Sequence, residues 1–428
     1  MQRSTLSPSP PQQELVCGRR HPGGGEGWGE GATCDVTVRF PQGRAPHPGP
    51  LPKSRFSPSC KLPLGRGRRF QWCFLNLLLC VFVLSSIAFA APPEDDHTNP
   101  SWYRTASGEK KAVITREDWA LRRQEILTRM QEVMGPLPDR TKWPEAQVRV
   151  LERKELDGGL QRQKIQFVTD SADRPVKAWV FLPAETAKVP QRRAAILCLH
   201  QTIGIGKDEP AGLGGSANLH YAIELAQHGF VTLAPDYPSF GEYPYTFPPE
   251  HGYISGSMKA ISDNMRAIDV LQAMDTVDPD RIGCIGHSLG GHNTMFTAVF
   301  DTRIWAMVSS CGFTRFHKYY GGKLAGWTSP RYMPRIANAH HNNPDEVPFD
   351  FPEIVAAFAP RPFLACSPVR DDNFEVSGVR DTIAAAQPIY KLLGAESALQ
   401  ATYPECAHDF PPATREMAYK FLEESLER

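Results

Sequence analysis

The sequence lacks an excess of charge: its 428 residues contain 47 basic and 47 acidic side chains. Because nucleic-acid binding needs a basic surface that neutralises phosphates, this balance argues against a nucleic-acid partner. The sequence also lacks a CxxC pair, a Cys/His spacing typical of metal ligands, and any apparent internal repeat. No metal and no cofactor is therefore implied, and we expect the partner to be a small or neutral molecule.

The first 90 residues differ from the rest. Residues 1–65 are rich in Pro and Gly without apolar periodicity, so we expect them to be disordered. Residues 66–90 combine arginines, an apolar run and the small-x-small end Ala88-Phe89-Ala90, which is typical of a secretory signal. An uncleaved membrane anchor over 70–91 is the competing interpretation. Either way we expect an exported protein, periplasmic or extracellular, whose true start lies downstream of Met1.

Cysteine gives little evidence for cross-linking. Five of the ten cysteines fall in the first 90 residues, which leaves an odd number in the exported part. At least one thiol is then free, and three of the five lie in apolar runs typical of small buried side chains. A bridge between Cys311 and Cys406 is conceivable, but no feature of the sequence supports it.

Apolar periodicity divides the exported part in two. Residues 91–143 read as a helical extension, with Thr115 as the N-cap of a helix that ends at Gly135-Pro136. Residues 144–428 begin with alternating runs typical of antiparallel strands, and from Arg193 strand-like and helix-like runs alternate. This rhythm predicts an α/β fold with a doubly wound, mostly parallel sheet and helices on both faces.

One motif indicates chemistry. Gly286-His287-Ser288-Leu289-Gly290 fits Gly-x-Ser-x-Gly, a pattern that roughly one chain in seven of this length carries by chance. Here it joins a β-branched strand to a helix-forming run, which is the context of a nucleophile elbow. A sharp turn there holds the Ser288 hydroxyl at a helix N-terminus, where negative charge is stabilised. The alternative is a plain glycine turn.

A serine nucleophile needs a base and an orienting acid. The expected chain order is Ser, acid, His, which favours His408, in the loop between the last strand and the last helix. Asp371 and Asp372 follow the preceding strand, and either carboxylate suits the role; we favour Asp371. The oxyanion is expected to bind the backbone N–H of Leu289 and a second donor, Thr202 or Gln201, with Thr202 preferred.

These residues resemble a known family. The elbow "DPDRIGCIGHSLGG", the acid loop "SPVRDDNF" and the histidine loop "AHDFP" are similar to those of α/β-hydrolases, in the dienelactone-hydrolase-like and acetyl-xylan-esterase-like branch. The resemblance implies the α/β-hydrolase fold, Asp371 and His408 as triad members, and an exported serine esterase. The implied reaction is cleavage of carboxylic esters through an acyl-enzyme, on an acylated, in particular acetylated, carbohydrate.

Two departures bear on the activity. Dienelactone hydrolases have cysteine where this chain has Ser288, which weighs against lactone opening, although a lactone hydrolase stays an alternative. A serine peptidase would use the same triad. The elbow also resembles that of prolyl-oligopeptidase-type domains, yet the chain has no room for their propeller.

A long irregular segment, 313–359, is expected to set specificity, because loops at the carboxyl edge of such sheets line the site. Its aromatic side chains suggest a platform for a sugar ring: Trp327, Tyr332, Tyr320 and, as a further candidate, Tyr319. The alternative is a surface cap packed on its own aromatics.

Overall fold

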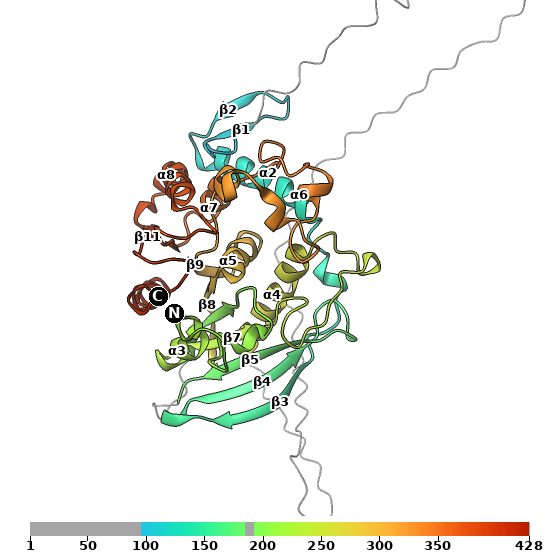
Figure 1. Ribbon diagram of the computed structural model, residues 1–428, viewed down its shortest axis with the longest axis vertical. Helices are drawn as coiled ribbons and strands as arrows, with labels where there is room; N and C mark the ends of the chain where they lie inside the picture. The colour runs from blue at the N-terminus through green and yellow to red at the C-terminus, as the bar shows by residue number, and fades with distance from the viewer. Residues whose placement is uncertain (1–95, 185–191, 428) are drawn as a thin grey trace, which may run out of the picture. The chain divides into compact units, whose positions relative to one another are not determined.

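The computed structural model describes residues 96–184 and 192–427 (Figure 1). The predicted leader over 1–65 and the predicted signal or anchor over 66–90 lie outside the described residues. Within the described part, no helix combines the length and the apolar character that a membrane crossing requires.

A nine-stranded sheet forms the centre of the fold (Figure 1). Its order is β11-β10-β9-β8-β6-β7-β5-β4-β3. The six strands from β6 to β11 pair in parallel, and β3, β4 and β5 continue the sheet antiparallel. The strands are β3 (Val148–Glu155), β4 (Gln161–Phe167), β5 (Val176–Leu182), β6 (Arg193–Leu199), β7 (Val231–Pro235), β8 (Val277–His287), β9 (Ile304–Ser310), β10 (Phe363–Cys366) and β11 (Leu399–Thr402). The predicted mostly parallel sheet is confirmed.

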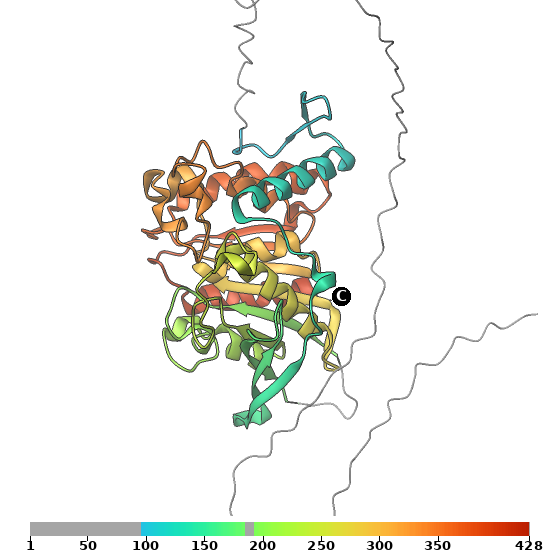
Figure 2. The same cartoon turned by 90° about the vertical axis from the view of Figure 1, so that its right-hand side faces the viewer.

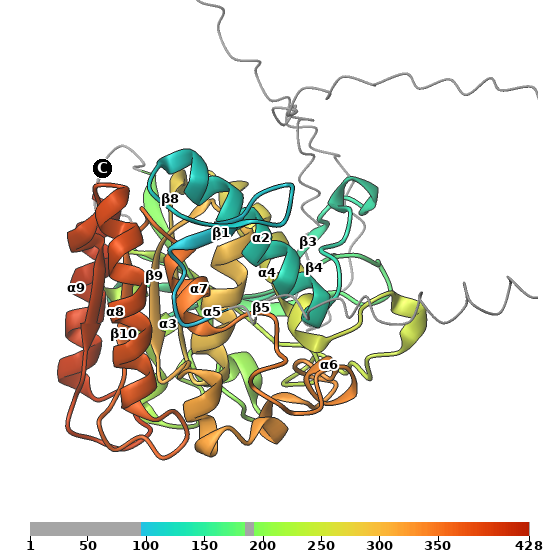
Figure 3. The same ribbon diagram turned by 90° about the horizontal axis from the view of Figure 1, so that it is seen from above.

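Helices cover both faces of the sheet, as predicted. The helices on one face are α3 (Tyr221–Gln227) and α9 (Pro412–Leu426), and those on the other are α4 (Gly256–Gln272), α5 (Leu289–Phe300) and α8 (Val376–Leu392). Successive side chains of β6 point to opposite faces, so Ile196 packs with α3 and α9 while Leu197 packs with α4 and α5. Figure 3 shows α4 and α5 beside each other from above.

The N-terminal extension consists of a hairpin and a helix. The hairpin of β1 (Trp102–Arg104) and β2 (Lys110–Ala112) is not foreseen by the sequence, whose runs there are too short to show a period. Helix α2 (Arg116–Met134) starts at the predicted cap, where Thr115 and Asp118 form a reciprocal capping box, and ends before Gly135.

The extension is attached to the irregular segment by a buried ion pair. The Arg122 side chain is fully buried and donates a hydrogen bond to Glu353. Because one buried charge without the other is costly, the pair fixes where α2 lies. Figure 2 shows α2 at the same end of the molecule as the orange segment around residues 313–359.

The segment over 313–359 contains four short helices joined by irregular chain. They are the 3-10 helices η6 (Phe316–Gly321) and η7 (Leu324–Trp327) and the helices α6 (Arg335–Asn338) and α7 (Phe351–Ala356). Phe316, Trp327 and Phe351 are buried and pack on one another in edge-to-face and tilted arrangements. The segment therefore continues the core beyond the edge of the sheet.

Candidate active site

Ser288 lies on a sharp turn between β8 and α5. Its backbone has φ 53° and ψ −116°, a conformation that non-glycine residues adopt only under strain. Neighbouring glycines permit the turn: a Cβ at Gly286 would collide with the backbone of Gly290, and one at Gly290 would collide with the carbonyl oxygen of Leu199. The Ser288 amide donates to the carbonyl of Ser310 over 2.8 Å, which ties the turn to β9.

Asp371 and His408 lie against each other in the two loops that follow β10 and β11. The distance between Asp371 Oδ2 and His408 Nδ1 is 2.9 Å. The other carboxylate oxygen accepts hydrogen bonds from the backbone N–H groups of Asn373 and Phe374, at 2.9 and 3.0 Å. Burial by itself raises the pKa of Asp371, but the hydrogen bonds and the charge of His408 outweigh it and lower that pKa. Asp371 is therefore held as a carboxylate.

The structure separates the two candidate acids. The Asp371 side chain is 1% exposed, whereas Asp372 is exposed and makes no described contact with His408. His408 keeps 23% of its side chain exposed. Its ring packs on that of His287, next to Ser288, with centroids 4.9 Å apart. The three predicted triad side chains thus come from neighbouring loops at the carboxyl edge of the sheet.

His287 is buried and neutral. Burial, together with the positive charge of nearby His408, lowers the pKa of His287 to about 3. Its Nδ1 pairs with Ser310 Oγ at 3.0 Å, so the ring is fixed from the β9 side. Sequence reasoning set this histidine aside, whereas in the structure its ring packs against that of His408 and supports it.

The predicted oxyanion donors face no protein acceptor. In residues 96–184 and 192–427, the backbone N–H groups of Leu289, Gln201 and Thr202 make no hydrogen bond with another described residue. Leu289 begins α5, and Gln201 and Thr202 follow β6, whose carbonyl edge the elbow touches at Gly290. All three stay candidates for binding an oxyanion.

His200 braces the loop that carries Gln201 and Thr202. Its Nε2 accepts the backbone N–H of Tyr237 at 2.9 Å, so Nδ1 carries the proton of the neutral ring and donates to the carbonyl of Gln201 at 2.6 Å. Burial lowers the pKa of His200, which keeps this tautomer neutral. The loop after β6 is thereby hydrogen-bonded to the loop after β7.

A buried ion pair reinforces the same connection. Lys207 and Asp236 have fully buried side chains, with Nζ 3.0 Å from Oδ2. Lys207 Nζ also lies 2.7 Å from Glu242 Oε2, and its backbone N–H donates to Asp236 Oδ1 at 2.9 Å. A Cβ at Gly206 or Gly241 would collide with Asp236. The sequence offered no signal for this pairing, because the partners are some 30 residues apart in different loops.

The residues of the predicted aromatic platform differ in their exposure to solvent. Trp327 is only 3% exposed and packs among Phe316, Tyr319 and Phe351, so it is part of the core and presents no open ring face. This corrects the expectation for Trp327, because the segment covers it on several sides. Tyr320 is 53% exposed, and Tyr319 is buried.

Tyr332 connects the segment to the candidate site. Its hydroxyl lies 2.9 Å from Thr202 Oγ1, and its ring lies 6.1 Å from that of His292. His292 is on α5, four residues after Ser288, and is buried with neither ring nitrogen hydrogen-bonded in the structure. Trp327 Nε1 is likewise without a partner. His292, next to the elbow, is the functional candidate that sequence reasoning passed over.

The five cysteines of the described residues are all free. The conceivable bridge between Cys311 and Cys406 is therefore not formed. Cys198, Cys284, Cys311 and Cys366 are buried, as expected for small side chains in apolar runs.

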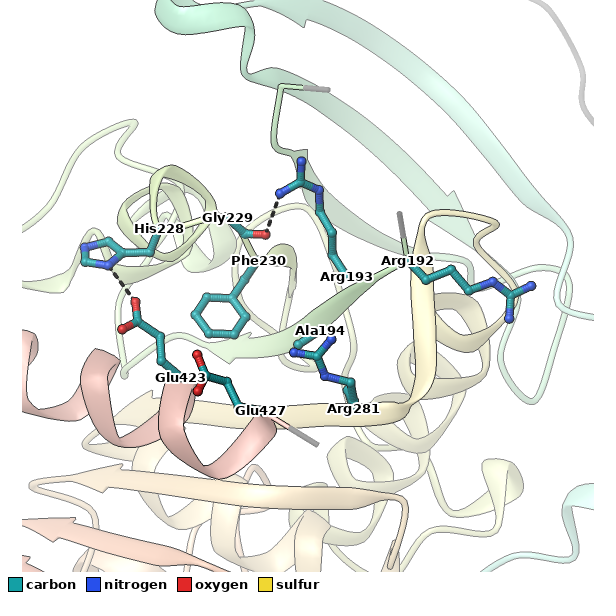
Figure 4. A pocket seen from close by; sticks show the side chains of 9 residues that line it. All are labelled: Arg192, Arg193, Ala194, His228, Gly229, Phe230, Arg281, Glu423 and Glu427. Carbon is teal, nitrogen blue, oxygen red and sulfur yellow. Dashed lines mark hydrogen bonds and ion pairs between the residues drawn. The ribbon is translucent and has the colours of Figure 1, made fainter. Parts of the chain in front are cut away.

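One pocket in the structure lies away from this site (Figure 4). Its lining includes Arg193 at the start of β6, Arg281 in β8, and Glu423 and Glu427 near the end of α9. It is therefore at the amino edge of the parallel strands, whereas Ser288 and His408 follow carboxyl ends.

The arrangement of strands and helices is that of the α/β-hydrolase fold. Residues 217–426 match the model of the Prolyl oligopeptidase family. The chain is similar to the putative hydrolase YtaP of Bacillus subtilis (strain 168), with 28% identity over 214 residues that cover 48% of this chain and 68% of the relative. It is also similar to the carbohydrate esterase MZ0003 of an unknown prokaryotic organism, at 23% identity over 32% of this chain and 34% of the relative.

Solved structures support the same fold. The glucuronoyl esterase from Solibacter usitatus superposes with a TM-score of 0.62 at 21% identity, over 78% of this chain and all of that one. A putative acetyl xylan esterase from Bacteroides fragilis NCTC 9343 superposes with a TM-score of 0.51 at 20% identity. The match covers 68% of this chain and 76% of that one. The protein is thus a hydrolase of α/β-hydrolase fold, and its relatives support the carboxylic-ester hydrolase that the sequence predicts.

Proposed function

We propose that this enzyme cleaves carboxylic esters of carbohydrates with Ser288 as nucleophile, His408 as base and Asp371 as orienting acid. The observation that carries the proposal is the Asp371–His408 pair at 2.9 Å, next to the strained elbow that presents Ser288. A hydroxyl is a weak nucleophile until a base takes its proton, and this arrangement supplies the base.

The arrangement supports the following reaction. Ser288 Oγ attacks the ester carbonyl while His408 takes the hydroxyl proton, and Asp371 stabilises the imidazolium that forms. The oxyanion binds the N–H of Leu289 and a second N–H from Thr202 or Gln201. His408 then protonates the leaving alcohol. Water, activated by the same imidazole, attacks the acyl-enzyme and releases the acid.

Two observations favour a carbohydrate ester. Several similar proteins are named as carbohydrate or glucuronoyl esterases. In addition, both ring nitrogens of His292, on α5 next to the elbow, are without a hydrogen-bond partner. Buried polar atoms without a partner are rare, and a sugar hydroxyl would satisfy one of them. Tyr332 connects His292 to the Thr202 loop and completes a wall of the proposed substrate site.

A serine peptidase is the second candidate, because residues 217–426 match the Prolyl oligopeptidase family. The two activities separate in one experiment. The full-length chain is assayed on acetylated xylan oligosaccharides, methyl glucuronate, short acyl esters and aminoacyl amides, with Ser288→Ala as the control. We expect ester cleavage that the variant lacks. Amide cleavage that exceeds ester cleavage would favour the peptidase, and equal rates for the variant would remove the triad assignment.

We also propose that the enzyme is exported, to the periplasm or beyond, after cleavage near Ala90. The basic residues, the apolar run and the small-x-small end of 66–90 support this proposal. Mass spectrometry of the mature N-terminus tests it. A terminus well upstream of Ala88 would indicate an uncleaved anchor instead.

A further inference from the structure

Three metal-ligating side chains meet directly behind the candidate triad. A ring nitrogen of His287, Sγ of Cys311 and a ring nitrogen of His408 all lie within 4.8 Å of one another. His287 ends β8, Cys311 follows the end of β9, and His408 lies in the loop after β11. The carboxyl ends of these parallel strands share one edge of the sheet, which brings together residues up to 121 positions apart.

Two of these side chains, His287 and Cys311, take no chemical step in the proposed hydrolysis. His287 contacts His408 from below and is fixed through Nδ1 by Ser310, which leaves its Nε2 for another partner. Cys311 has a left-handed backbone, with φ 48°, and its amide donates to the carbonyl of Cys366 at 2.9 Å. This geometry directs the thiol toward the histidine loop, where it makes a weak contact with the carbonyl of Asp409 at 3.5 Å.

We propose that His287, Cys311 and His408 bind one Zn²⁺ ion, and that this ion switches the hydrolase off. Two imidazoles and one thiolate are a preferred donor set for zinc, with a fourth position left for water. The inhibitory consequence rests on the proposed function of His408, whereas the binding itself does not.

Only small movements are needed to close the site. Zn–N bonds of about 2.0 Å and Zn–S bonds of about 2.3 Å place the ligand atoms of a tetrahedral ion roughly 3.3–3.7 Å apart. The present separations, at most 4.8 Å, require shifts of about 1 Å. His408 is the partly exposed member, so the ion enters from its side. The Cys311 thiol releases one proton as it becomes the thiolate ligand.

The bound ion disables the base. A zinc–nitrogen bond occupies the lone pair of His408 or displaces the hydrogen bond between Nδ1 and Asp371. In the first case the imidazole cannot accept the proton of Ser288, and in the second it is no longer oriented toward the serine. Inhibition is then reversible by a chelator and independent of any change in fold.

The test measures binding and activity separately. Full-length protein is titrated with Co²⁺ as a spectroscopic substitute for zinc, and thiolate-to-cobalt absorption in the near ultraviolet reports ligation by cysteine. Zn²⁺ binding is followed by calorimetry, and ester hydrolysis is followed with and without EDTA. We expect one equivalent of metal, a thiolate band, and loss of activity that EDTA restores.

Cys311→Ser is the diagnostic variant, and Cys406→Ser is its matched control, because Cys406 is the most exposed thiol of the described residues and lies outside the cluster. Because the thiol lies beside the Asp371 carboxylate, we expect Cys311→Ser to keep measurable ester hydrolysis without zinc rather than the full wild-type rate. We expect it to lose the thiolate band and to raise the zinc concentration for half-inhibition of its own activity at least about tenfold, since even outer-shell partners contribute about 10–100-fold. Cys406→Ser should behave as wild type. If Cys311→Ser does not fold, Cys311→Gly replaces it, because glycine suits the left-handed backbone.

Each result decides the matter. Absence of the thiolate band, inhibition of Cys311→Ser at the wild-type zinc concentration, or loss of inhibition in Cys406→Ser would overturn the site. A band that disappears in Cys311→Ser from a protein without esterase activity would support the site and remove the proposed function instead. Both proposals can thus fail independently.

Discussion

Replacing Asp371 with asparagine tests the proposed triad at the point where the sequence left two acids open. One carboxylate oxygen of Asp371 accepts two backbone N–H groups, at 2.9 and 3.0 Å, and the other faces His408 Nδ1 at 2.9 Å. In Asp371→Asn the amide oxygen keeps the two backbone bonds, because the opposite orientation sets NH₂ against two donors and costs about 1–3 kcal/mol for each unsatisfied group. The amide NH₂ then points at Nδ1.

That orientation puts the imidazole in the wrong tautomer. Nδ1 must accept from the amide, so the proton moves to Nε2 and no lone pair is left for Ser288. The imidazolium also loses its negative partner. We expect kcat to fall roughly 10⁴-fold, the scale known for this substitution in another serine hydrolase, which corresponds to about 5 kcal/mol in the barrier.

Steady-state hydrolysis of a short acyl ester measures the effect, with Asp372→Asn as the matched control. Asp372 is exposed and does not contact His408, so its variant should keep kcat within about twofold of wild type. Comparable circular dichroism and melting temperature establish that both variants fold. A large loss in Asp372→Asn with little loss in Asp371→Asn would refute the assignment of the acid.

Three further predictions concern residues that support the site. Gly290→Ala should lose about 1–3 kcal/mol of unfolding free energy, measured by urea denaturation, and most activity, because the added Cβ would collide with the Leu199 carbonyl. Gly204→Ala is the control and should leave the unfolding free energy nearly unchanged, because its added Cβ meets no atom within 4 Å. His292→Phe should reduce the loss of stability on acidification. Burial lowers the pKa of His292 to about 3, so from pH 6.5 down to about 3 the unfolded chain binds one more proton at this residue, and stability falls by about 1.4 kcal/mol per pH unit on its account. Urea midpoints across this range should therefore fall less steeply in the variant than in wild type, with the remaining slope including that of His287. Asp236→Asn removes the fully buried carboxylate partner of Lys207 and leaves the partly exposed Glu242 as its counter-charge, so it should cost about 1–3 kcal/mol by thermal unfolding. Asp236→Glu should restore part of this loss, whereas equal melting temperatures for wild type and the asparagine variant would contradict the bracing role.

Much of the fold could be predicted from local sequence patterns. The capping box at Thr115 and the elbow at Ser288 depend on residues that are near one another in sequence, so short-range sterics and hydrogen bonds determine them. The parallel sheet followed from continuous apolar runs that alternate with helical periods. The N-terminal hairpin was missed because its strands are three residues each, too short for a period of two to appear.

The site needed information that no local pattern contains. Asp371 and Asp372 are adjacent and chemically equal, and only the packing of the loop after β10 buries one against His408 and exposes the other. The sequence predicted Trp327 as a binding residue, because aromatic side chains both bind sugar rings and fill hydrophobic cores. Its burial depends on neighbours from several elements, which the sequence does not reveal.

By itself, the sequence determined the alternation of strands and helices around the parallel sheet, the nucleophile turn and the class of reaction, because these follow from periodicity, glycine at a sharp turn and motif order along the chain. Only the tertiary structure decided which acid meets the histidine, which aromatic ring is buried, and that His287, Cys311 and His408 converge. Those outcomes depend on contacts between strand ends that are distant in sequence, and such contacts exist only once the parallel sheet has aligned its carboxyl edge.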